Sequence, residues 1–465
     1  MSQWSLLTAD ERRTRWERHD VSIAVIGFGY IGGAIGTLLA SEGYRVVGID
    51  KNPVLLRSFQ EGKCPFEEPG LDKKLDAAMQ RNTLSVSDQF TTAAGSDVIL
   101  IVVGTPLNDE YAPVLDHLKS AVTSLGEVLE RGMLVMVKST VPPLTTQQLI
   151  KPILEEVSGL QAGTDFGLVF SPERVDEGNV LTGLRKIPIV IGGVDQRSSE
   201  LAAEFWSRTL GVETMIVADP TTAELVKLAD NQWIDLNIAL ANEIALLSDE
   251  IGVDAMEVIR AANSLPKGQH WVNILYPSIG VGGYCLTKDP WFLHRFGAQR
   301  DITMQTPQCS RNVNEQMPTV TVSRINTCLR KHNKNPSQSR IAVLGLSFKN
   351  NTGDIRNTPS QPIIEMLEHN GCTVVVYDPL VPDAQIRQLT TATIAPDIQT
   401  AVEGADLIAC LSCHTQFLDV ELTELKAQTH DTCWFLDGRL GFDPGRVTAA
   451  GFAYTAIGGH RYATN

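Results

Sequence analysis

The sequence predicts an α/β protein with two Rossmann-like, doubly wound parallel-sheet domains joined by a long central helix and helical segment. Short apolar, β-branched runs alternate with amphipathic helical runs in the first third of the chain, and the alternation returns in the last quarter. Strands that alternate with helices are typical of βαβ units, which build parallel sheets. Between the two regions lies a single long helical pattern.

The composition indicates a globular protein large enough for several domains. Of its 465 residues, 43% are hydrophobic and 20% charged, and the formal net charge is −15. This charge argues against non-specific binding to nucleic acid or an anionic membrane, and an anionic ligand would need a local cluster of Lys and Arg. No window suits a transmembrane helix, and residues 1–20 lack the apolar core of a signal peptide. We therefore expect a cytoplasmic protein whose eight cysteines are thiols.

The first Rossmann domain is expected over residues 21–218, after a polar extension or helix over residues 1–20. Its strand runs are apolar almost throughout, which favours parallel strands covered on both faces. These runs span residues 21–29, 44–50, 96–106, 132–142 and 166–173.

A glycine-rich turn follows the first run. Gly27, Gly29 and Gly32 form a GxGxxG pattern between a strand and a helical run, and Asp50 ends the next strand about twenty residues later. In a dinucleotide site the glycines allow a tight turn, close approach of the pyrophosphate and close helix packing. The helix N-terminus attracts the phosphates, and a carboxylate on the ribose hydroxyls favours NAD over NADP. A structural glycine turn is the alternative, but it does not require the acidic residue. The predicted cofactor contacts here are Gly27, Gly29, Tyr30, Ile31, Gly32 and Asp50.

Polar residues follow three later strand runs, at the sheet edge where open α/β folds bind ligands. Thr105 lies in VGTP, Thr140 in KSTVPP and Glu173 in SPER. The two threonine hydroxyls could donate to the nicotinamide ribose or to a bound water. Ordinary loop polarity is the alternative, and three such ends on one sheet argue against it.

The central segment is expected over residues 219–330 and begins with a helix over residues 220–253. Pro220 suits a first helical turn and Gly252 a helix end. Glu224, Lys227 and Asn231 share one helix face by their spacing. Their neighbours are largely apolar, so we expect this polar face to line a cleft, where Lys227 could stabilise a developing oxyanion. A helix of this length could also connect two domains and pack against a partner chain.

A polar linker is expected over residues 331–338, and the second Rossmann-like domain over residues 339–465. Its strand runs span residues 339–349, 372–379, 405–412 and 431–439. Cys410 and Cys413 form a CxxC pair in or just after the third run. Because no second cysteine pair or suitably spaced histidine accompanies it, we interpret this pair as structural and expect no metal site.

The stretch GVGGYCLTKDP, residues 280–290, places three glycines before Cys285. A thiolate is a strong nucleophile when cations lower its pKa, and Lys288 lies three residues on, followed by Asp289 as a candidate base. A buried, inert cysteine is the commoner case, so the pattern alone leaves both interpretations open. Metal ligation is disfavoured, because His270 and His294 bring no second thiol or HxxxH spacing. Combined with NAD, a nucleophilic cysteine would oxidise an aldehyde through a thiohemiacetal and a thioester.

At this point the motifs resemble those of the nucleotide-sugar 6-dehydrogenases, the UDP-glucose, UDP-N-acetylhexosamine and GDP-mannose dehydrogenase family. The resemblance spans nearly the whole chain, in GFGYIGG, CPFEEPGL, VGTP, KSTVPP, SPERVDEG, AELVKLADNQWIDLNIALANEI, GVGGYCLTKDP, LGLSFKNNTGDIRNTPS, VYDP and DGR. It implies a two-fold oxidation of the sugar C6 alcohol to a carboxylate with two NAD, in a homodimer or higher oligomer built on the central helix.

The resemblance also implies a role for each site residue. Cys285 would be the nucleophile, Lys227 and Asn231 would stabilise oxyanions, and Asp289 would support proton transfer. Thr140, Glu173 and Glu177 would order water and sugar. The catalytic residues that it implies are Cys285, Lys227, Asn231, Asp289, Glu173 and Thr140. The cofactor-binding residues that it implies are those of the glycine turn together with Thr105, Thr140, Glu177, Lys288 and Arg356. The substrate-binding residues that it implies are Arg174, Val175, Lys227, Asn231, Lys267, Gly282, Phe348, Lys349 and Arg439. Five cations would supply the positive cluster that an anionic ligand needs: Lys227, Lys288, Lys349, Arg356 and Arg439.

The sugar is less closely specified. Arg174 and Val175 stand where UDP-glucose and GDP-mannose members usually carry Phe-Leu, which is similar to the UDP-N-acetylhexosamine branch. GYCLTKDP keeps the tyrosine and lysine typical of the UDP-glucose branch. Lys267 lies where other members carry an arginine that reaches the neighbouring subunit's sugar, and Ser278 stands where a glycine is usual. We expect a UDP-ManNAc or UDP-GlcNAc type of 6-dehydrogenase, with UDP-glucose as the alternative. More distant alternatives are a one-step β-hydroxyacid dehydrogenase, which would not need Cys285, and a non-catalytic binding protein, which would require a broken site.

Overall fold

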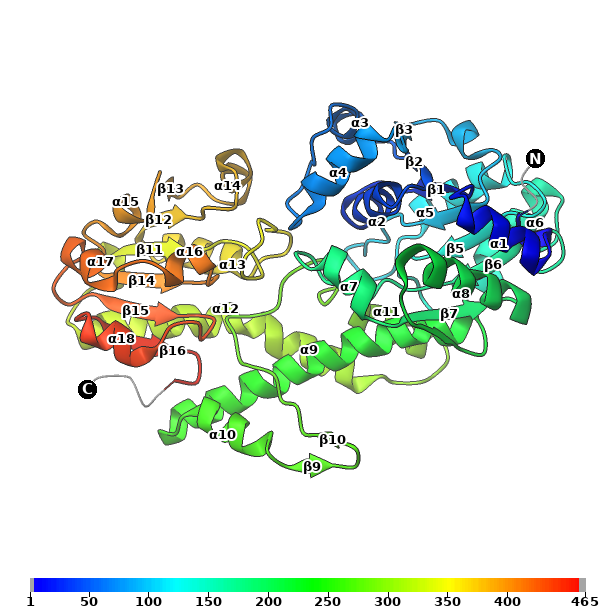
Figure 1. Cartoon of the computed structure of the whole chain (residues 1–465). Coiled ribbons are helices and arrows are strands. Elements are labelled where there is room, and N and C mark those ends of the chain that lie inside the picture. The colour runs from blue at the N-terminus through cyan, green and yellow to red at the C-terminus, as the bar shows by residue number, and fades with distance from the viewer. Residues whose placement is uncertain (1–3, 460–465) are drawn as a thin grey trace. The chain divides into compact units, whose positions relative to one another are not determined.

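A computed structural model describes residues 4–459 (Figure 1). The predicted N-terminal extension and C-terminal domain therefore reach outside the described residues, at 1–3 and 460–465. The chain divides into two compact units, Met1–Asp230 with Trp291–Asp301, and Asn231–Pro290 with Ile302–Asn465. The division falls inside the long central helix, and the predicted three-domain layout stays a prediction.

Within the described residues, the first unit contains an eight-stranded sheet in the order β3-β2-β1-β4-β5-β6-β7-β8. Every neighbouring pair is parallel except β6 and β7, which are antiparallel. The five predicted strands are present as β1, β2, β4, β5 and β6. The bounds are β1 (Ser22–Ile26), β2 (Arg45–Ile49), β3 (Leu84–Ser87), β4 (Val98–Ile101), β5 (Leu134–Val137), β6 (Gly167–Phe170), β7 (Ile189–Gly193) and β8 (Thr214–Ile216).

Helices cover both faces of this sheet, and β1 shows how. Ile23 and Val25 belong to one buried cluster with residues of α2, α4 and α8, whereas Ala24 and Ile26 belong to another with residues of α5 and α6. Burial on both faces is the physical reason that the strand runs are apolar almost throughout. The bounds are η1 (Trp4–Leu6), α1 (Ala9–Glu17), α2 (Tyr30–Ser41), α3 (Pro53–Gln60), α4 (Leu71–Gln80), η2 (Phe90–Ala93), α5 (Asp116–Gly126), η3 (Thr146–Ile150), α6 (Lys151–Ser158), α7 (Val180–Lys186) and α8 (Gln196–Leu210).

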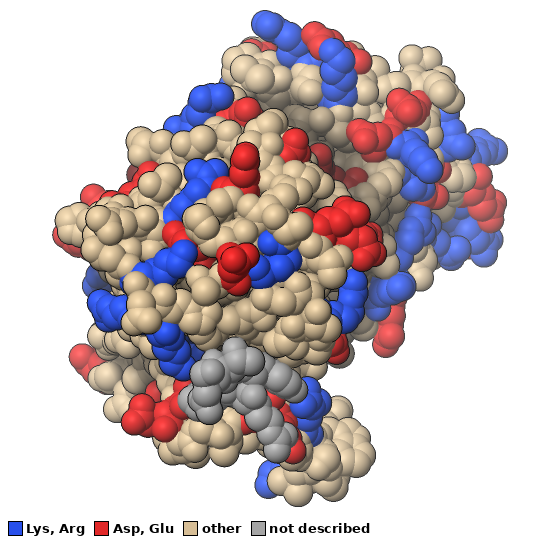
Figure 2. Space-filling view, turned by 90° about the vertical axis from the view of Figure 1, so that its left-hand side faces the viewer, with Lys and Arg blue, Asp and Glu red and all other residues tan. Residues whose placement is uncertain are grey.

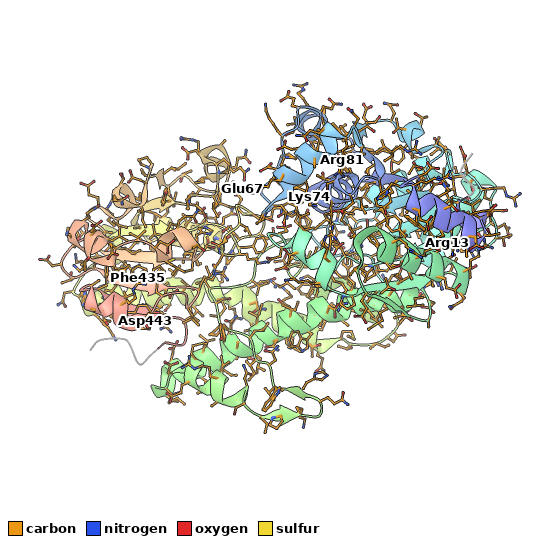
Figure 3. All side chains as sticks on the ribbon, viewed as in Figure 1. Arg13, Glu67, Lys74, Arg81, Phe435 and Asp443 are labelled. Atoms are coloured by element: carbon orange, nitrogen blue, oxygen red, sulfur yellow. The ribbon has the colours of Figure 1, made fainter. Side chains whose placement is uncertain are left out.

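The N-terminal segment packs into the first unit. Trp4 and Trp16 are buried, with their ring centroids 5.6 Å apart. The Arg15 guanidinium donates to both carboxylate oxygens of Asp97, at 2.9 and 2.7 Å. The polar composition of this segment concealed these anchors. Elsewhere in this unit, Arg81, labelled in Figure 3, follows helix α4 and donates to the Ser41 carbonyl at 2.7 Å.

The central helix α9 runs without interruption over Pro220–Ile251 (Figure 1). Gly252 follows it with φ +75°, a left-handed conformation that glycine adopts without strain, so both predicted ends are present. At 1.5 Å per residue the helix is about 48 Å long. The elements that follow are α10 (Ala255–Ala262), a hairpin of β9 (Pro266–Lys267) and β10 (His270–Trp271), α11 (Asp289–Ala298) and α12 (Gln305–Lys331).

The second unit contains, among its described residues, a six-stranded parallel sheet in the order β13-β12-β11-β14-β15-β16. The four predicted strands are β11, β12, β14 and β15. Labelled Phe435 of β15 is buried in the sheet's core, and Asp443 caps α18 by accepting from the Arg446 amide at 2.8 Å (Figure 3). The bounds are η4 (Pro336–Gln338), β11 (Arg340–Leu344), α13 (Ser360–His369), β12 (Thr373–Tyr377), α14 (Asp383–Leu389), β13 (Thr393–Ile394), α15 (Ile398–Val402), β14 (Leu407–Cys410), α16 (Thr415–Leu418), α17 (Leu422–Gln428), β15 (Trp434–Asp437), α18 (Pro444–Ala449) and β16 (Ala453–Ala456).

The surface carries charges of both signs. On the face shown in Figure 2, Lys and Arg side chains are interspersed with Asp and Glu rather than gathered into one patch. None of the helices over residues 4–459 is both long and apolar enough to cross a membrane.

Candidate functional site

A cavity of about 310 Å³ opens at the carboxyl edge of the first sheet. Gly27, Gly29, Asp50 and Gly104 are among the residues that line it. These residues follow β1, β2 and β4, so the cavity lies where the strand order reverses direction around β1. Open α/β sheets bind their ligands at this kind of position.

The three glycines of the turn meet three different requirements. Gly27 has φ +88°, and a Cβ there would lie 2.7 Å from the Val102 carbonyl oxygen. A Cβ on Gly32 would lie 2.0 Å from the Gly27 carbonyl oxygen, whereas one on Gly29 would meet nothing within 4 Å. Open space above Gly29, at the start of α2, is where a pyrophosphate needs to approach the helix N-terminus. The residues of this turn therefore fit a dinucleotide.

Asp50 is held in place by the backbone while it faces the cavity. Its Oδ2 accepts from the Phe28 amide at 2.8 Å and its Oδ1 from the Asn52 amide at 2.9 Å. Each carboxylate oxygen can accept more than one hydrogen bond, so both retain capacity for ribose hydroxyls. Ile31, in the first turn of α2, instead packs against the apolar core.

Glu68 is a buried acidic residue that sequence reasoning missed. Its carboxylate accepts from the Tyr30 hydroxyl at 2.8 Å and from the Gly178 and Val180 amides at 2.9 Å each. Burial, followed by this hydrogen bond, raises the pKa of Tyr30, which keeps the phenol protonated. Glu68 thus ties the loop that carries Glu177 to the cofactor turn. The only sequence signal was its place in the CPFEEPGL motif.

The strand ends after β4, β5 and β6 also meet. The Thr105 hydroxyl donates to the Thr140 carbonyl at 2.6 Å. Glu173 lies beside Lys138, with 3.2 Å between Lys138 Nζ and Glu173 Oε2. Lys138 is buried, donates to the Ser171 carbonyl at 3.1 Å, and was not predicted as a site residue. It fixes the carboxylate for which a water-ordering role is predicted.

Glu224 connects the central helix to the Thr140 loop. It is buried on α9, and its Oε1 accepts from the Thr146 amide at 2.7 Å. Burial raises the pKa of Glu224 to about 7, although the bonds to Thr146 oppose this shift. Lys227, one turn further along the same helix, is also buried. The predicted polar face of this helix is therefore enclosed by protein rather than solvated.

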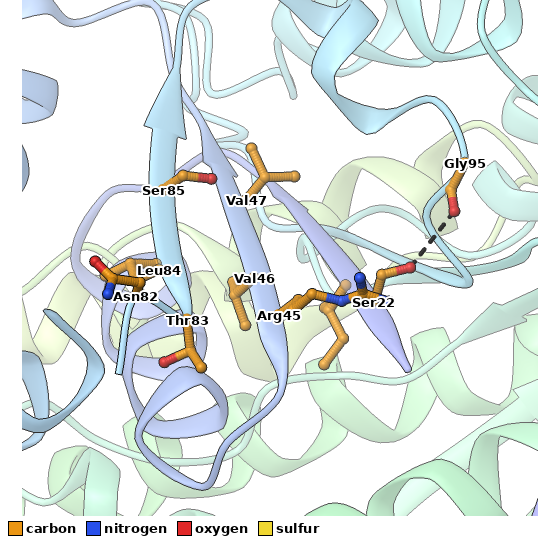
Figure 4. Close-up of a pocket in the computed structure, with 10 residues that line it drawn as sticks. Ser22, Arg45, Val46, Val47, Asn82, Thr83, Leu84, Ser85 and Gly95 are labelled. Atoms are coloured by element: carbon orange, nitrogen blue, oxygen red, sulfur yellow. Dashed lines mark hydrogen bonds between the residues drawn. The ribbon is translucent and has the colours of Figure 1, made fainter. Parts of the chain in front are cut away.

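A larger cavity, of about 370 Å³, lies at the opposite edge of the first sheet (Figure 4). Ser22, Arg45 and Thr83 line it, and the Ser22 hydroxyl donates to the Gly95 carbonyl at 3.4 Å. None of the predicted site residues lines this cavity, and it adjoins the amino ends of β1, β2 and β3. Of these two cavities, the smaller one combines the glycine turn with the acidic residue, which is the combination that a dinucleotide site requires.

The second unit brings Cys285, Lys288, Asp289 and Asn231 together. Cys285 is an exposed thiol just before α11, and its carbonyl accepts from the Lys288 and Asp289 amides at 3.2 and 2.9 Å. The Asp289 carboxylate accepts from the Asn231 side-chain amide and from Lys288 Nζ, both at 2.5 Å. All three of these polar side chains are buried, so the charges lie in an environment of low polarity.

The glycine loop before Cys285 packs against the predicted nucleotide-binding loop. A Cβ on Gly282 would lie 2.5 Å from Phe348 Cβ, and one on Gly283 2.8 Å from the Phe348 ring. The Gly283 amide donates to the Arg356 carbonyl at 3.0 Å. Arg439 donates to the Phe348 carbonyl at 2.8 Å, and burial lowers the pKa of this arginine to about 10. Lys349 follows Phe348 in the same loop.

Other predicted residues have different surroundings. Arg174 pairs with Asp230 at 2.8 Å, and Val175 packs beside Gly183. Lys267 is exposed on the β9–β10 hairpin. Cys410 and Cys413 are buried thiols, which agrees with their structural interpretation. Over residues 4–459, no group of three or more His, Cys, Asp or Glu could hold a metal ion.

Comparison with known proteins gives matches along almost the whole chain. Three models of the UDP-glucose/GDP-mannose dehydrogenase family match: the NAD binding domain at residues 21–210, the central domain at 221–316 and the UDP binding domain at 342–444. The UDP-N-acetyl-D-mannosamine dehydrogenase of Pyrococcus horikoshii is 36% identical over 418 residues, which cover 90% of this chain and 95% of that protein. The enzyme of the same name from Yersinia pestis is 34% identical, with 90% and 98% covered.

Solved structures also match almost the whole chain. The structure of the Pyrococcus horikoshii UDP-D-ManNAc dehydrogenase has a TM-score of 0.85 at 35% identity, covering 96% of this chain and all of that one. A UDP-glucose dehydrogenase from Pyrobaculum islandicum has a TM-score of 0.83 at 28% identity, covering 94% and 98%.

Proposed function

The chain belongs to the UDP-glucose/GDP-mannose dehydrogenase family and is an NAD-dependent nucleotide-sugar dehydrogenase, and from this premise we propose the reaction, the substrate and the assembly. The proposed reaction is a two-fold oxidation of the C6 alcohol of a UDP-N-acetylhexosamine to the uronate, through a thioester on Cys285. The observation that carries the proposal is the cluster of Asn231, Lys288 and Asp289 beside the exposed Cys285.

The first oxidation converts the alcohol to an aldehyde. The C6 carbon loses a hydride, and the hydroxyl proton passes toward Asp289. Lys227 and Asn231, one turn apart on α9, stabilise the negative charge that develops on the oxygen. NAD, when bound at the glycine turn, accepts the hydride of each oxidation.

The second oxidation requires the cysteine. The Cys285 thiolate adds to the aldehyde carbon and forms a thiohemiacetal, whose oxyanion is stabilised by the same Lys227 and Asn231. Loss of the second hydride gives a thioester, and a water ordered by Thr140 and Glu173 attacks it. The carbon–sulfur bond breaks and the thiolate is regenerated. The balance is one alcohol, one water and two NAD⁺ consumed for one carboxylate, two NADH and three protons.

The substrate's nucleotide is assigned to the second unit. Phe348, Lys349 and Arg439 lie within or beside the loop that packs on the Cys285 glycines, and the family's UDP binding domain matches this region. Lys349 and Arg439 would neutralise the diphosphate. They would contribute to the local cluster of cations that an anionic ligand needs on a chain with a negative net charge. Lys288 and Arg356 are proposed near the cofactor, as is Glu177.

The sugar is proposed to be an N-acetylhexosamine of the ManNAc or GlcNAc type. The names of the relatives from Pyrococcus horikoshii and Yersinia pestis support the ManNAc type. UDP-glucose is the second candidate, because Tyr284 and Lys288 keep the pattern typical of that branch. The test is a panel of UDP-ManNAc, UDP-GlcNAc, UDP-GalNAc, UDP-glucose and GDP-mannose, scored by kcat/KM. A preference for UDP-glucose would contradict the assigned sugar, and no turnover of any UDP-sugar would contradict the function.

The assembly is proposed to be a homodimer, or a higher oligomer, through α9. Large apolar side chains are exposed along one stripe of this helix, at Trp233, Leu236, Leu240, Leu247 and Ile251. Their spacing of three, four or seven residues keeps them on one face. A second copy of the same helix presents an equally long apolar stripe, which suits a two-fold symmetric contact. Lys267 is proposed to act across this contact, and the enzyme to work in the cytoplasm.

A further inference from the structure

The second sheet repeats the backbone of the dinucleotide turn. Gly345, directly after β11, has φ +79°, as Gly27 after β1 has φ +88°. The Gly345 amide donates to the Tyr377 carbonyl at 2.9 Å, and the Gly27 amide donates to the Ile49 carbonyl at 2.8 Å. The two turns therefore start with the same conformation and the same bond to the neighbouring strand.

The acidic residue of the turn is repeated as well. Asp378 follows β12 as Asp50 follows β2, and each accepts one amide from the glycine turn and one from two residues further along its own strand end. These bonds run from Phe28 and Asn52 to Asp50 at 2.8 and 2.9 Å, and from Leu346 and Leu380 to Asp378 at 2.6 and 2.8 Å.

The two units differ in what the carboxylate does next. Asp50 lines the cofactor cavity, whereas Asp378 is buried and its Oδ2 also accepts from His414 Nε2 at 3.1 Å. In the first unit α2 begins directly after the turn, but in the second no helix lies between Gly345 and Ser360. The intervening loop contains Phe348 and Lys349. Asp378 thus anchors a loop in the second unit, whereas Asp50, at the equivalent position in the first unit, faces the cofactor cavity.

His414 transmits this anchor to the loop. Its Nδ1 accepts from the Asn351 amide at 2.9 Å, which fixes the tautomer, so Nε2 carries the proton that Asp378 accepts. Asn351 has φ +59°, a left-handed conformation that asparagine adopts at small cost. Its side chain also accepts from the Thr415 amide at 2.8 Å. Residues 414–415 therefore hold both the backbone and the side chain of Asn351.

We infer that Asp378 and His414 are positioning residues, which hold the 346–352 loop in the conformation that presents Phe348 and Lys349 to the diphosphate of a nucleoside diphosphate sugar. This inference rests on the proposed function, because that function assigns the nucleotide to this loop. It adds that the carboxylate at the position equivalent to Asp50 supports a different nucleotide contact in the second unit.

Two substitutions separate the two ring nitrogens. His414→Gln keeps a donor for Asp378 near the Nε2 position and removes the acceptor for Asn351, whereas His414→Asn keeps an acceptor near the Nδ1 position. We expect His414→Gln to weaken binding of UDP, measured by calorimetry on the full-length protein, by about tenfold, since one buried amide loses its acceptor. KM for the UDP-sugar should rise in parallel and KM for NAD should stay within about twofold. His414→Asn should recover part of the lost affinity.

Amide exchange supplies a readout that does not depend on activity. The Asn351 amide should be protected in the wild-type protein and exchange faster in His414→Gln, while the Phe28 amide, bonded to Asp50, stays protected. Asp50→Asn is the matched control, and it should raise KM for NAD and leave UDP affinity unchanged. In a Lys349→Ala background, His414→Gln should add little further loss, because both act on the same contact.

Unchanged UDP affinity and unchanged Asn351 exchange in His414→Gln would overturn the inference, as would equal losses in UDP and NAD affinity or additive losses with Lys349→Ala. Absence of UDP binding in the wild-type protein would instead contradict the proposed function.

Discussion

The side-chain amide of Asn231 donates to the carboxylate of Asp289 at 2.5 Å, and both side chains are buried. Asp289 also pairs with Lys288 Nζ at 2.5 Å. An amide group carries two protons, so this bond orients Asn231 and leaves its second proton for another acceptor. The carboxylate thus fixes the group that the proposed mechanism uses on the substrate oxyanion.

Asn231→Ala should therefore lower kcat by about 10² to 10³, the usual cost of removing one oxyanion donor. KM for the UDP-sugar should change less, because the proposed nucleotide contacts lie in a different loop. Steady-state kinetics measure both values. Gln232→Ala, on the next residue of the same helix, is the control, and a loss of kcat as large as that of Asn231→Ala would argue for a structural effect.

Lys138 should matter for stability as well as for activity. Replacing this buried cation with Met leaves the Glu173 carboxylate without its charge partner, so the free energy of unfolding should fall by about 3 kcal/mol. Lys119→Met, which breaks an exposed pair with Asp116, should cost less than about 0.5 kcal/mol. Chemical denaturation of both variants makes the comparison, and equal effects would show that Lys138 is not a buried charge support.

Glu224 gives a pH dependence whose sign follows from its burial. The folded protein raises the pKa of Glu224 from 4.5 to about 7, so it binds this proton more tightly than the unfolded chain does. The resulting stabilisation is complete below about pH 4.5 and is lost as the pH rises through 7. Glu224→Gln should flatten this trend, which spans on the order of 2 to 3 kcal/mol. Unfolding curves between pH 5 and 8 measure it, with exposed Glu156→Gln as the control that should keep the wild-type slope.

The α9 stripe predicts a change of mass in solution. Leu240→Glu with Leu247→Glu places charges within the exposed apolar face, and a dimer formed there should dissociate. Light scattering measures the mass. Val54→Glu changes another exposed apolar residue, on α3, and should leave the assembly intact. A doubly substituted protein with the wild-type mass would place the contact elsewhere.

The sequence predicted much of the fold because buried parallel strands are apolar on both faces. All nine predicted strands are present, but among the described residues β3, β7, β8, β9, β10, β13 and β16 were missed. Strands β3, β8 and β13 are short and partly exposed, so they lack a continuous apolar run. The antiparallel pairing of β6 and β7 was also missed, since apolar periodicity carries no information about strand direction.

Some residues of the candidate site were likewise predictable from the sequence, and others were not. The glycine turn was predictable because each glycine answers a separate local demand. Lys138 and Glu68 could not be predicted, because their partners are distant in sequence. The sequence alone also does not show whether a charged residue is buried or exposed to solvent. His414 looked like one polar residue after a strand, and only the fold brings it to Asp378.

The central claim is that Cys285 carries the second oxidation, and the amount of NADH formed per UDP-sugar consumed tests it most directly. The wild-type protein should form two NADH per sugar, and so should Cys309→Ala, which changes another exposed thiol. Cys285→Ala should form at most one and release no uronate, because no thioester can form. Two NADH per sugar from Cys285→Ala would contradict the account.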